Sequence, residues 1–129
     1  LYSVEVRLPV EVSSSERLHL QQWLTKHCGW DVRSPELAVL KLVGVRLLPG
    51  PTGPASFLMY ESASGERFTI YTAKAEAEAT QMRYSAQGNE SALFWSDRGV
   101  AYVVSGVGDR GRLTQIAQSV YDQMEKAGG

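Results

Sequence analysis

The chain has 129 residues and a formal net charge of −1, with 13 lysines and arginines against 14 aspartates and glutamates. Its composition, 43% hydrophobic and 21% charged, is typical of one globular domain with its own core and excludes a disordered chain. Because the charges balance, there is no basic field for a nucleic-acid backbone or an anionic lipid surface, and we expect no nucleic-acid binding.

The first part of the chain predicts a strand followed by a helix. Val4–Leu8 alternates apolar and polar residues, and Pro9 predicts an edge strand or a bend. Ser13 and Glu16 have the spacing of a capping box. Apolar residues then recur at helical spacing until Gly29, which is suited to end a helix.

The middle of the chain predicts three strands. Leu37–Leu48 is apolar on both sides, which indicates a central strand that is at least partly covered on both faces. Gly44 interrupts this strand and predicts a bulge. Residues 49–54 are too rich in proline and glycine for regular structure, so we expect a turn or loop there. Strands at 55–61 and 67–73 would form a hairpin.

The last part predicts a meander and a second helix. Residues 74–79 are polar without an apolar face, and we interpret them as a mobile connection. Strands follow at 81–86, 92–97 and 100–105, and Asp109 is suited to cap the final helix. The apolar stripe of that helix comprises Leu113, Ile116, Ala117, Val120, Tyr121 and Met124.

These elements predict one domain, residues 1–129, with an α+β fold: a mostly antiparallel sheet of five to six strands with two amphipathic helices on one face. The other face would be less covered. Phenylalanines alternate with tyrosine and tryptophan along the strands, so we expect amphipathic rings there, unless all of them are core or half-buried sheet residues. The candidate interaction face comprises Tyr60, Tyr71, Trp95 and Tyr102.

Two short motifs suggest ligands but fit other roles better. Gly106–Gly111 matches G-x-G-x-x-G, but the chain offers no parallel strand after the following helix, so a turn into a helix cap explains the glycines better than a dinucleotide. His19, His27 and Cys28 do not have the spacing of metal ligands on one helix. We therefore expect neither a metal nor a cofactor.

No catalytic motif accompanies them. None of the serines lies in a G-x-S-x-G elbow, so we expect a protein that is not an enzyme. Cys28 is the only cysteine, which excludes an internal disulfide, and its place beside Leu24 on the first helix favours burial over reactivity.

Several segments, in order, resemble the extracytoplasmic domain of bacterial transmembrane anti-sigma factors. Residues 42–50, LVGVRLLPG, are similar to the family's RLVGGRLLPG, and residues 5–12, EVRLPVEV, to its EVRHPVEV. Leu8 and Val45 depart from these patterns, since the family has histidine and a second glycine there. The similarity continues through His19-Leu20, Trp23-Leu24, Met59-Tyr60-Glu61, Thr69–Tyr71, Phe94-Trp95 and the helix at 113–121.

The resemblance implies a longer parent protein, and the start of this chain at Leu1, in strand-like sequence, agrees with a fragment. A short cytoplasmic domain would hold an extracytoplasmic-function sigma factor inactive. One helix would cross the inner membrane of a Gram-negative bacterium, and the present domain would lie in the periplasm. It would not contact the sigma factor but would receive an envelope signal from a periplasmic protein or ligand, or expose a linker to proteolysis. A homodimer is also possible.

The alternative is a small α+β enzyme or ligand-binding domain with its site near the Pro/Gly-rich segment 49–54. Such a protein would have a deep pocket there, with convergent polar groups and a titratable residue of strongly shifted pKa.

Overall fold

The computed structural model describes residues 4–7, 14–30, 37, 40–50, 53–75, 80–107 and 110–128. Its elements, in chain order, are β1 (Val4–Arg7), α1 (Ser14–Cys28), β2 (Leu40–Gly50), β3 (Gly53–Ser62), β4 (Arg67–Lys74), β5 (Arg83–Gln87), β6 (Glu90–Asp97), β7 (Val100–Val107) and α2 (Arg110–Gly128). Leu8 and Pro9 at the end of the expected first strand, the expected caps Ser13 and Asp109, and positions 76–79 of the expected connection lie outside the described residues.

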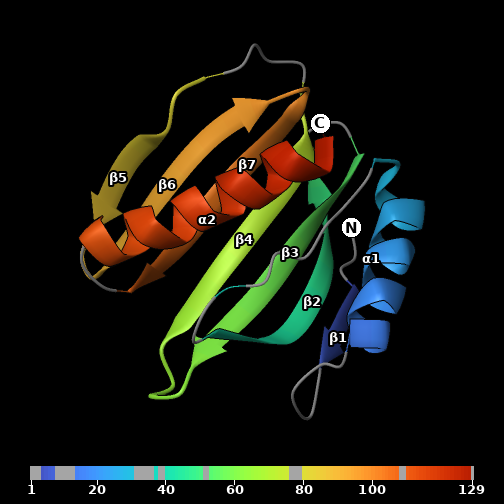
Figure 1. The fold of residues 1–129 in the computed structure, drawn as a ribbon, viewed down its shortest axis with the longest axis horizontal. Helices are drawn as coiled ribbons and strands as arrows, with labels where there is room; N and C mark the ends of the chain where they lie inside the picture. Colours follow the sequence, from blue (N-terminus) through green and yellow to red (C-terminus); the bar gives the residue numbers. More distant parts are fainter. Residues whose placement is uncertain are drawn as a thin grey trace.

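The strands form a single antiparallel sheet in the order β1-β2-β3-β4-β7-β6-β5. The α+β prediction is confirmed, and the described residues contain seven strands, one more than the upper expected number. Most neighbours are joined by short connections, but β7 returns to pair with β4. The sheet is therefore built from two hairpin groups, β1–β4 and β5–β7, which meet at the β4–β7 pair (Figure 1).

Both helices pack on the same face of the sheet, α1 beside β1–β3 and α2 across β4, β6 and β7 (Figure 1). Along each strand alternate residues point to this face, because side chains of a strand alternate between the two sides. The hydrophobic core between helices and sheet comprises Leu24, Cys28, Leu37, Leu42, Val45, Leu47, Leu58, Tyr60, Phe68, Ile70, Leu93, Trp95, Val104, Leu113, Ala117 and Val120.

The helices follow their predicted patterns. In α1, Leu24 and Cys28 are buried and Trp23 is half-buried. The helix ends at Cys28 and is followed by Gly29, whose φ of 88° is the left-handed conformation expected of a terminating glycine. Its amide donates to the Thr25 carbonyl over 3.0 Å. In α2 the whole predicted stripe is buried or packs against the core.

The bulge predicted at Gly44 is present in β2. The β2–β3 register shifts between Leu42 and Gly44, which leaves Val43 as the extra residue. Because one residue is inserted, Leu42 and Val45 both face the helices although they are three positions apart. A bulge thus explains how one strand buries apolar residues that break simple alternation.

The turn or loop expected at 49–54 is corrected in its extent by the structure. Strands β2 and β3 continue into it, and Pro49 lies opposite Pro54 while Gly50 lies opposite Gly53. Two prolines can face each other in a ladder because neither has an N–H group to donate, and a non-hydrogen-bonded pair requires none.

No helix within the described residues has the length and apolar character needed to cross a membrane.

Candidate functional site

The sheet face opposite the helices, named the open face here, carries a row of side chains that runs across six strands. The strand registers place these residues directly beside one another. This central row consists of Arg46, Phe57, Tyr71, Val103, Phe94 and Arg83, from β2 to β5.

The central row is accessible at its apolar positions. Phe94 is 37% exposed, and Phe57, Tyr71 and Val103 are half-buried. On one side the row is flanked by small residues, namely Ala55, Ala73, Ala101 and Ser96. Rings standing beside alanines form a raised apolar ridge, which is the kind of feature that marks interaction surfaces.

Polar residues of the open face form hydrogen bonds and an ion pair with residues on neighbouring strands. Thr69 on β4 and Ser105 on β7 join their hydroxyl groups over 2.5 Å. On β3 and β4, the Arg67 Nε donates to the Glu61 Oε2 over 2.9 Å. Lys41 lies opposite Glu61 on the other neighbouring strand, so this carboxylate lies between two cations.

The expected set of four interacting rings is corrected for three of its members. Tyr71 is on the open face, but Tyr60 is 0% and Trp95 3% exposed, and both belong to the core under the helices. Tyr102 stacks on Trp95, with ring centroids 5.1 Å apart and planes 13° from parallel.

The strand register explains this correction. Within each strand the predicted alternation is right, since Phe94 and Trp95 lie on opposite faces. However, the β3–β4 register places Phe57 opposite Tyr71 and Tyr60 opposite Phe68. Each face therefore carries both kinds of ring. Because the prediction assigned phenylalanines to one face and tyrosine and tryptophan to the other, it missed exposed Phe94 and half-buried Phe57 on the open face.

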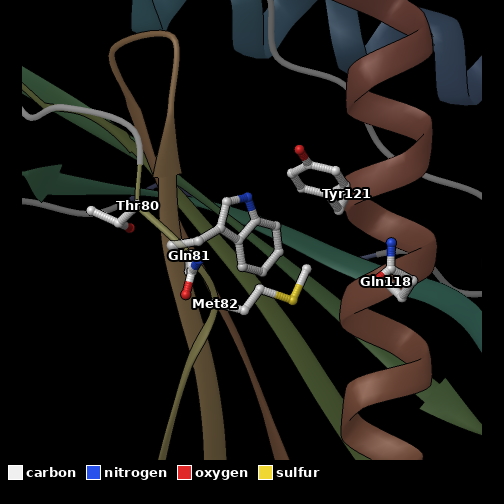
Figure 2. A pocket seen from close by; sticks show the side chains of 6 residues that line it. Thr80, Gln81, Met82, Gln118 and Tyr121 are labelled. Atoms are coloured by element: carbon white, nitrogen blue, oxygen red, sulfur yellow. The ribbon is translucent and has the colours of Figure 1, made fainter.

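Beside the core rings, the chain leading into β5 and one side of α2 enclose a hollow of about 500 Å³. It is lined by Thr80, Gln81, Met82, Trp95, Gln118 and Tyr121, and Figure 2 shows the labelled side chains around it. Thr80 is fixed to β6, because its amide donates to the Ser96 carbonyl over 2.9 Å and its Oγ1 accepts from the Ser96 amide over 3.0 Å. None of these lining residues is charged, so the hollow contains no acid or base that could transfer a proton at neutral pH.

A second hollow, of about 380 Å³, lies at the Pro/Gly-rich segment, where the alternative prediction placed a site. Its lining residues are His27, Leu47, Leu48, Pro49, Gly50, Gly53 and Pro54. His27 is the only titratable group among them, and its Nδ1 donates to the Trp23 carbonyl over 2.9 Å. The hollow offers a small apolar ligand a single polar side chain, without a nucleophile or a carboxylate among the lining residues.

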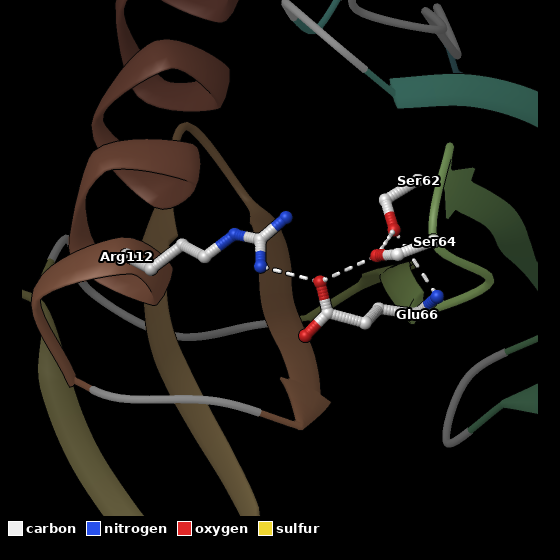
Figure 3. A network of polar contacts seen from close by, with 4 residues as sticks. All are labelled: Ser62, Ser64, Glu66 and Arg112. Carbon is white, nitrogen blue, oxygen red and sulfur yellow. Dashed lines mark hydrogen bonds and ion pairs between the residues drawn. The ribbon is translucent and has the colours of Figure 1, made fainter.

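A polar network joins the β3–β4 hairpin to the start of α2 (Figure 3). The Arg112 guanidinium donates to the Glu66 Oε1 over 2.5 Å, and the Ser64 hydroxyl donates to the same oxygen over 3.3 Å. The Glu66 amide donates to the Ser62 hydroxyl over 3.1 Å. The hydrogen bond from Arg112, more than its charge, holds the pKa of Glu66 below its ordinary value. Since Arg112 also lies 5.0 Å from the Phe68 ring centroid, the network positions the helix rather than forming a reactive centre.

Cys28 lies within the core, as its helical position predicted. It is 8% exposed, and burial raises the pKa of its thiol to about 11, so the reactive thiolate is scarce at neutral pH. His19 and His27 do not join it in a metal site, and the described residues contain no group of three or more His, Cys, Asp or Glu side chains that could hold a metal ion.

No family model, no curated protein sequence and no solved structure matches this chain. The function must therefore be inferred from the residues themselves and from the surfaces that the fold leaves accessible.

Proposed function

We propose that this chain is a non-catalytic interaction domain, the periplasmic sensory domain of a single-pass transmembrane anti-sigma factor, and that the open face is the surface where it meets its signal partner. Its segments resemble that family in order from residue 5 to residue 121. The observation that carries the proposal is the unequal covering of the sheet: both helices pack on one face, and exposed Phe94 with half-buried Phe57 and Tyr71 lies on the other.

Aromatic rings that remain in contact with water have a free-energy cost that a partner could remove. Phe57, Tyr71 and Phe94 would each lose apolar contact with water if a partner covered the central row. Burial of apolar area contributes about 25 cal/mol per Å², and aromatic side chains frequently dominate the binding energy of interfaces. The row crosses five strand spacings, which is about 24 Å, wide enough for a segment of another protein.

The experiment removes residues 1–129 from the parent protein and measures transcription that depends on its sigma factor. A signal-receiving domain predicts a changed output, either constitutive transcription or permanent silence. Unchanged output and unchanged induction would contradict the proposal. We also expect an apolar segment of about 20 residues before Leu1 in the parent, because the domain must be connected to a membrane helix.

A point variant tests the open face itself. Phe94→Ser in the parent protein should alter the response to the envelope signal, since this ring is the most exposed ring of the row. The matched control is Leu18→Ser, because Leu18 is also an exposed apolar residue, at 54%, but lies on α1. An equal effect of both substitutions would indicate a general loss of apolar surface and would count against the open face.

A ligand-binding domain is the second candidate, favoured by the hollow of about 380 Å³ at the β2–β3 turn. This volume is within the range of small-molecule sites. A fragment titration followed by NMR, in which amide shifts cluster at Leu48, Gly50 and Gly53 and are lost in His27→Ala, would support it. Shifts scattered over the molecule would contradict it.

A further inference from the structure

We infer that the partner of the open face is an acidic polypeptide segment that also presents apolar or aromatic side chains. The inference rests on the proposed function, because it names the chemical class of the partner for the same surface. It follows from the charges that surround the central row and from the chemistry of the row.

The open face is cationic, although the whole chain has a formal net charge of −1. Where side chains are described, strand alternation and register place four cations and two carboxylates on this face, namely Lys41, Arg46, Arg67, Arg83, Glu61 and Glu90. One face of a slightly acidic protein is therefore positive.

The distribution of these charges points to a partner that crosses the strands. Glu61 is engaged by Arg67 over 2.9 Å, which reduces its effect on an incoming anion. The central row has a cation at each end, Arg46 on β2 and the exposed Arg83 on β5, with the apolar side chains between them. An extended peptide of about seven residues covers the distance of about 24 Å between these strands. Such a segment could place carboxylates near both cations and apolar side chains on the rings between them.

A second copy of this chain is a poorer occupant. If two open faces stacked with a two-fold axis parallel to the strands, Arg83 would lie over Arg46 of the other copy. If the axis ran along the row, Arg83 would lie over its own equivalent. Like charges opposed across an interface destabilise it, so both arrangements are disfavoured.

An anionic polysaccharide is also a poorer occupant, because sugars require many hydrogen-bond partners. The apolar part of the row consists of Phe57, Tyr71, Val103 and Phe94, in which the Tyr71 hydroxyl is the only polar side-chain group. Sugar hydroxyl groups covering phenylalanine and valine would lose water without a replacement. Apolar side chains of a polypeptide lose no hydrogen bonds with water when they cover these residues.

The experiment uses the 129-residue chain and a fluorescent random copolymer of glutamate and tyrosine as the acidic, aromatic probe. The comparison probes are a copolymer of lysine and tyrosine, polyglutamate and polygalacturonate. We expect the glutamate–tyrosine copolymer to bind, polyglutamate to bind at least about tenfold more weakly because it lacks rings, and the lysine copolymer not to bind. NMR amide shifts should map to the central row.

The matched variants are Arg83→Glu and Lys26→Glu, which make the same charge change at exposed positions on the open face and on α1. Arg83→Glu should weaken copolymer binding about fivefold or more, and Lys26→Glu less than about twofold. Phe94→Ser should weaken it further. Because Arg83 is exposed on an edge strand, the fold should persist, and circular dichroism checks this; Arg83→Gln gives a second, milder variant.

Five results would overturn the inference: no binding of the glutamate–tyrosine copolymer, equal binding of the lysine copolymer, preferred binding of polygalacturonate, insensitivity to Arg83→Glu, or sedimentation of the free protein as a dimer that Phe94→Ser dissociates. Failure of the proposed function is recognised separately. If Phe94→Ser changes sigma-dependent transcription in the parent but the copolymer does not bind, the open face remains the signalling surface and its partner is not acidic. If the copolymer binds while transcription ignores the substitution, the signalling role is rejected.

Discussion

At the scale of single residues, Gly106 shows that packing between two strands can require the first glycine of the G-x-G-x-x-G pattern. This glycine lies opposite Phe68 in the β4–β7 pair, and a Cβ added to it would overlap the ring of Phe68 and approach the Arg67 carbonyl oxygen at 3.2 Å. We expect Gly106→Ala to lower the free energy of unfolding by about 1–3 kcal/mol, because the ring or the strand must shift. Urea denaturation measures the change.

The control for this prediction is the same substitution in a Phe68→Leu background. A smaller aliphatic side chain leaves room for the added methyl group, so the loss caused by Gly106→Ala should shrink there. An undiminished loss would mean that backbone conformation, not the Phe68 ring, requires glycine. The first glycine of the G-x-G-x-x-G pattern is thus explained by packing between two strands.

Cys28 gives a prediction for alkaline pH. Burial raises the pKa of its thiol from 9.0 to about 11, so the unfolded chain ionises first as the pH rises. Its contribution to stability is therefore complete below pH 9 and is lost progressively between pH 9 and about 11. Unfolding free energies measured through this range should fall more steeply in the wild type than in Cys28→Ala. Parallel curves would contradict the buried thiol.

At the scale of elements, the sequence predicted each helix and most strands because its periodicities are strong. The stripe of α2 and the break at Gly44 needed only local information, and both predictions are confirmed. Predicting which side chains share a face of the sheet needed information from more than one strand. Alternation along β3 predicts that Phe57 and Tyr60 lie on opposite faces of the sheet. Which rings of β4 lie beside each of them depends on the pairing register of the two strands. The candidate interaction face therefore required a register that the sequence does not encode locally.

The docking of α1 is tested by two leucines of the same helix. Leu24 is 0% exposed in the core, whereas Leu18 is 54% exposed. Leu24→Ala should lower the free energy of unfolding by about 2–5 kcal/mol, because it leaves a cavity against β3. Leu18→Ala should change it by less than about 0.5 kcal/mol. Thermal denaturation of the pair would contradict the packing of α1 if the two losses were similar.

The polar network in Figure 3 connects the β3–β4 hairpin to α2, and the titration of the Glu66 carboxylate measures this connection. Because Arg112 lowers the pKa of Glu66, the stabilisation that this carboxylate provides is present above its unfolded pKa and is lost as the pH falls through its folded pKa. NMR titration of the Glu66 carboxyl carbon should show a pKa that rises toward its ordinary value in Arg112→Gln. The control Arg67→Gln, which breaks the ion pair with Glu61, should leave the titration of Glu66 in place.

At the scale of the whole molecule, the sheet is two hairpin groups joined by one pair of strands. Each helix lies mainly over one group, α1 against β3 and α2 against β6 and β7. The β4–β7 pair is thus the place where the groups become one core, through Ile70 opposite Val104, which are 1% and 0% exposed. Sequential pairing alone does not predict the β4–β7 pair. It predicts only that β7 pairs with β6, which would allow β7 to be an edge strand.

Hydrogen exchange tests this assembly. If the two groups form one cooperative unit, the amides of β4 and β7 should exchange only through global unfolding, and their free energies of exchange should equal that measured by urea. Strands β1 and β5 lie at the two edges, and the described side chains of β5 are exposed except for half-buried Tyr84, so their amides should exchange faster. Val104→Ala should then lower the protection of β3 and β6 by the same amount, since both depend on the shared core. If β6 lost protection while β3 kept it, the groups would be unfolding independently, and the open face would be two surfaces rather than the continuous one that a single partner could cover.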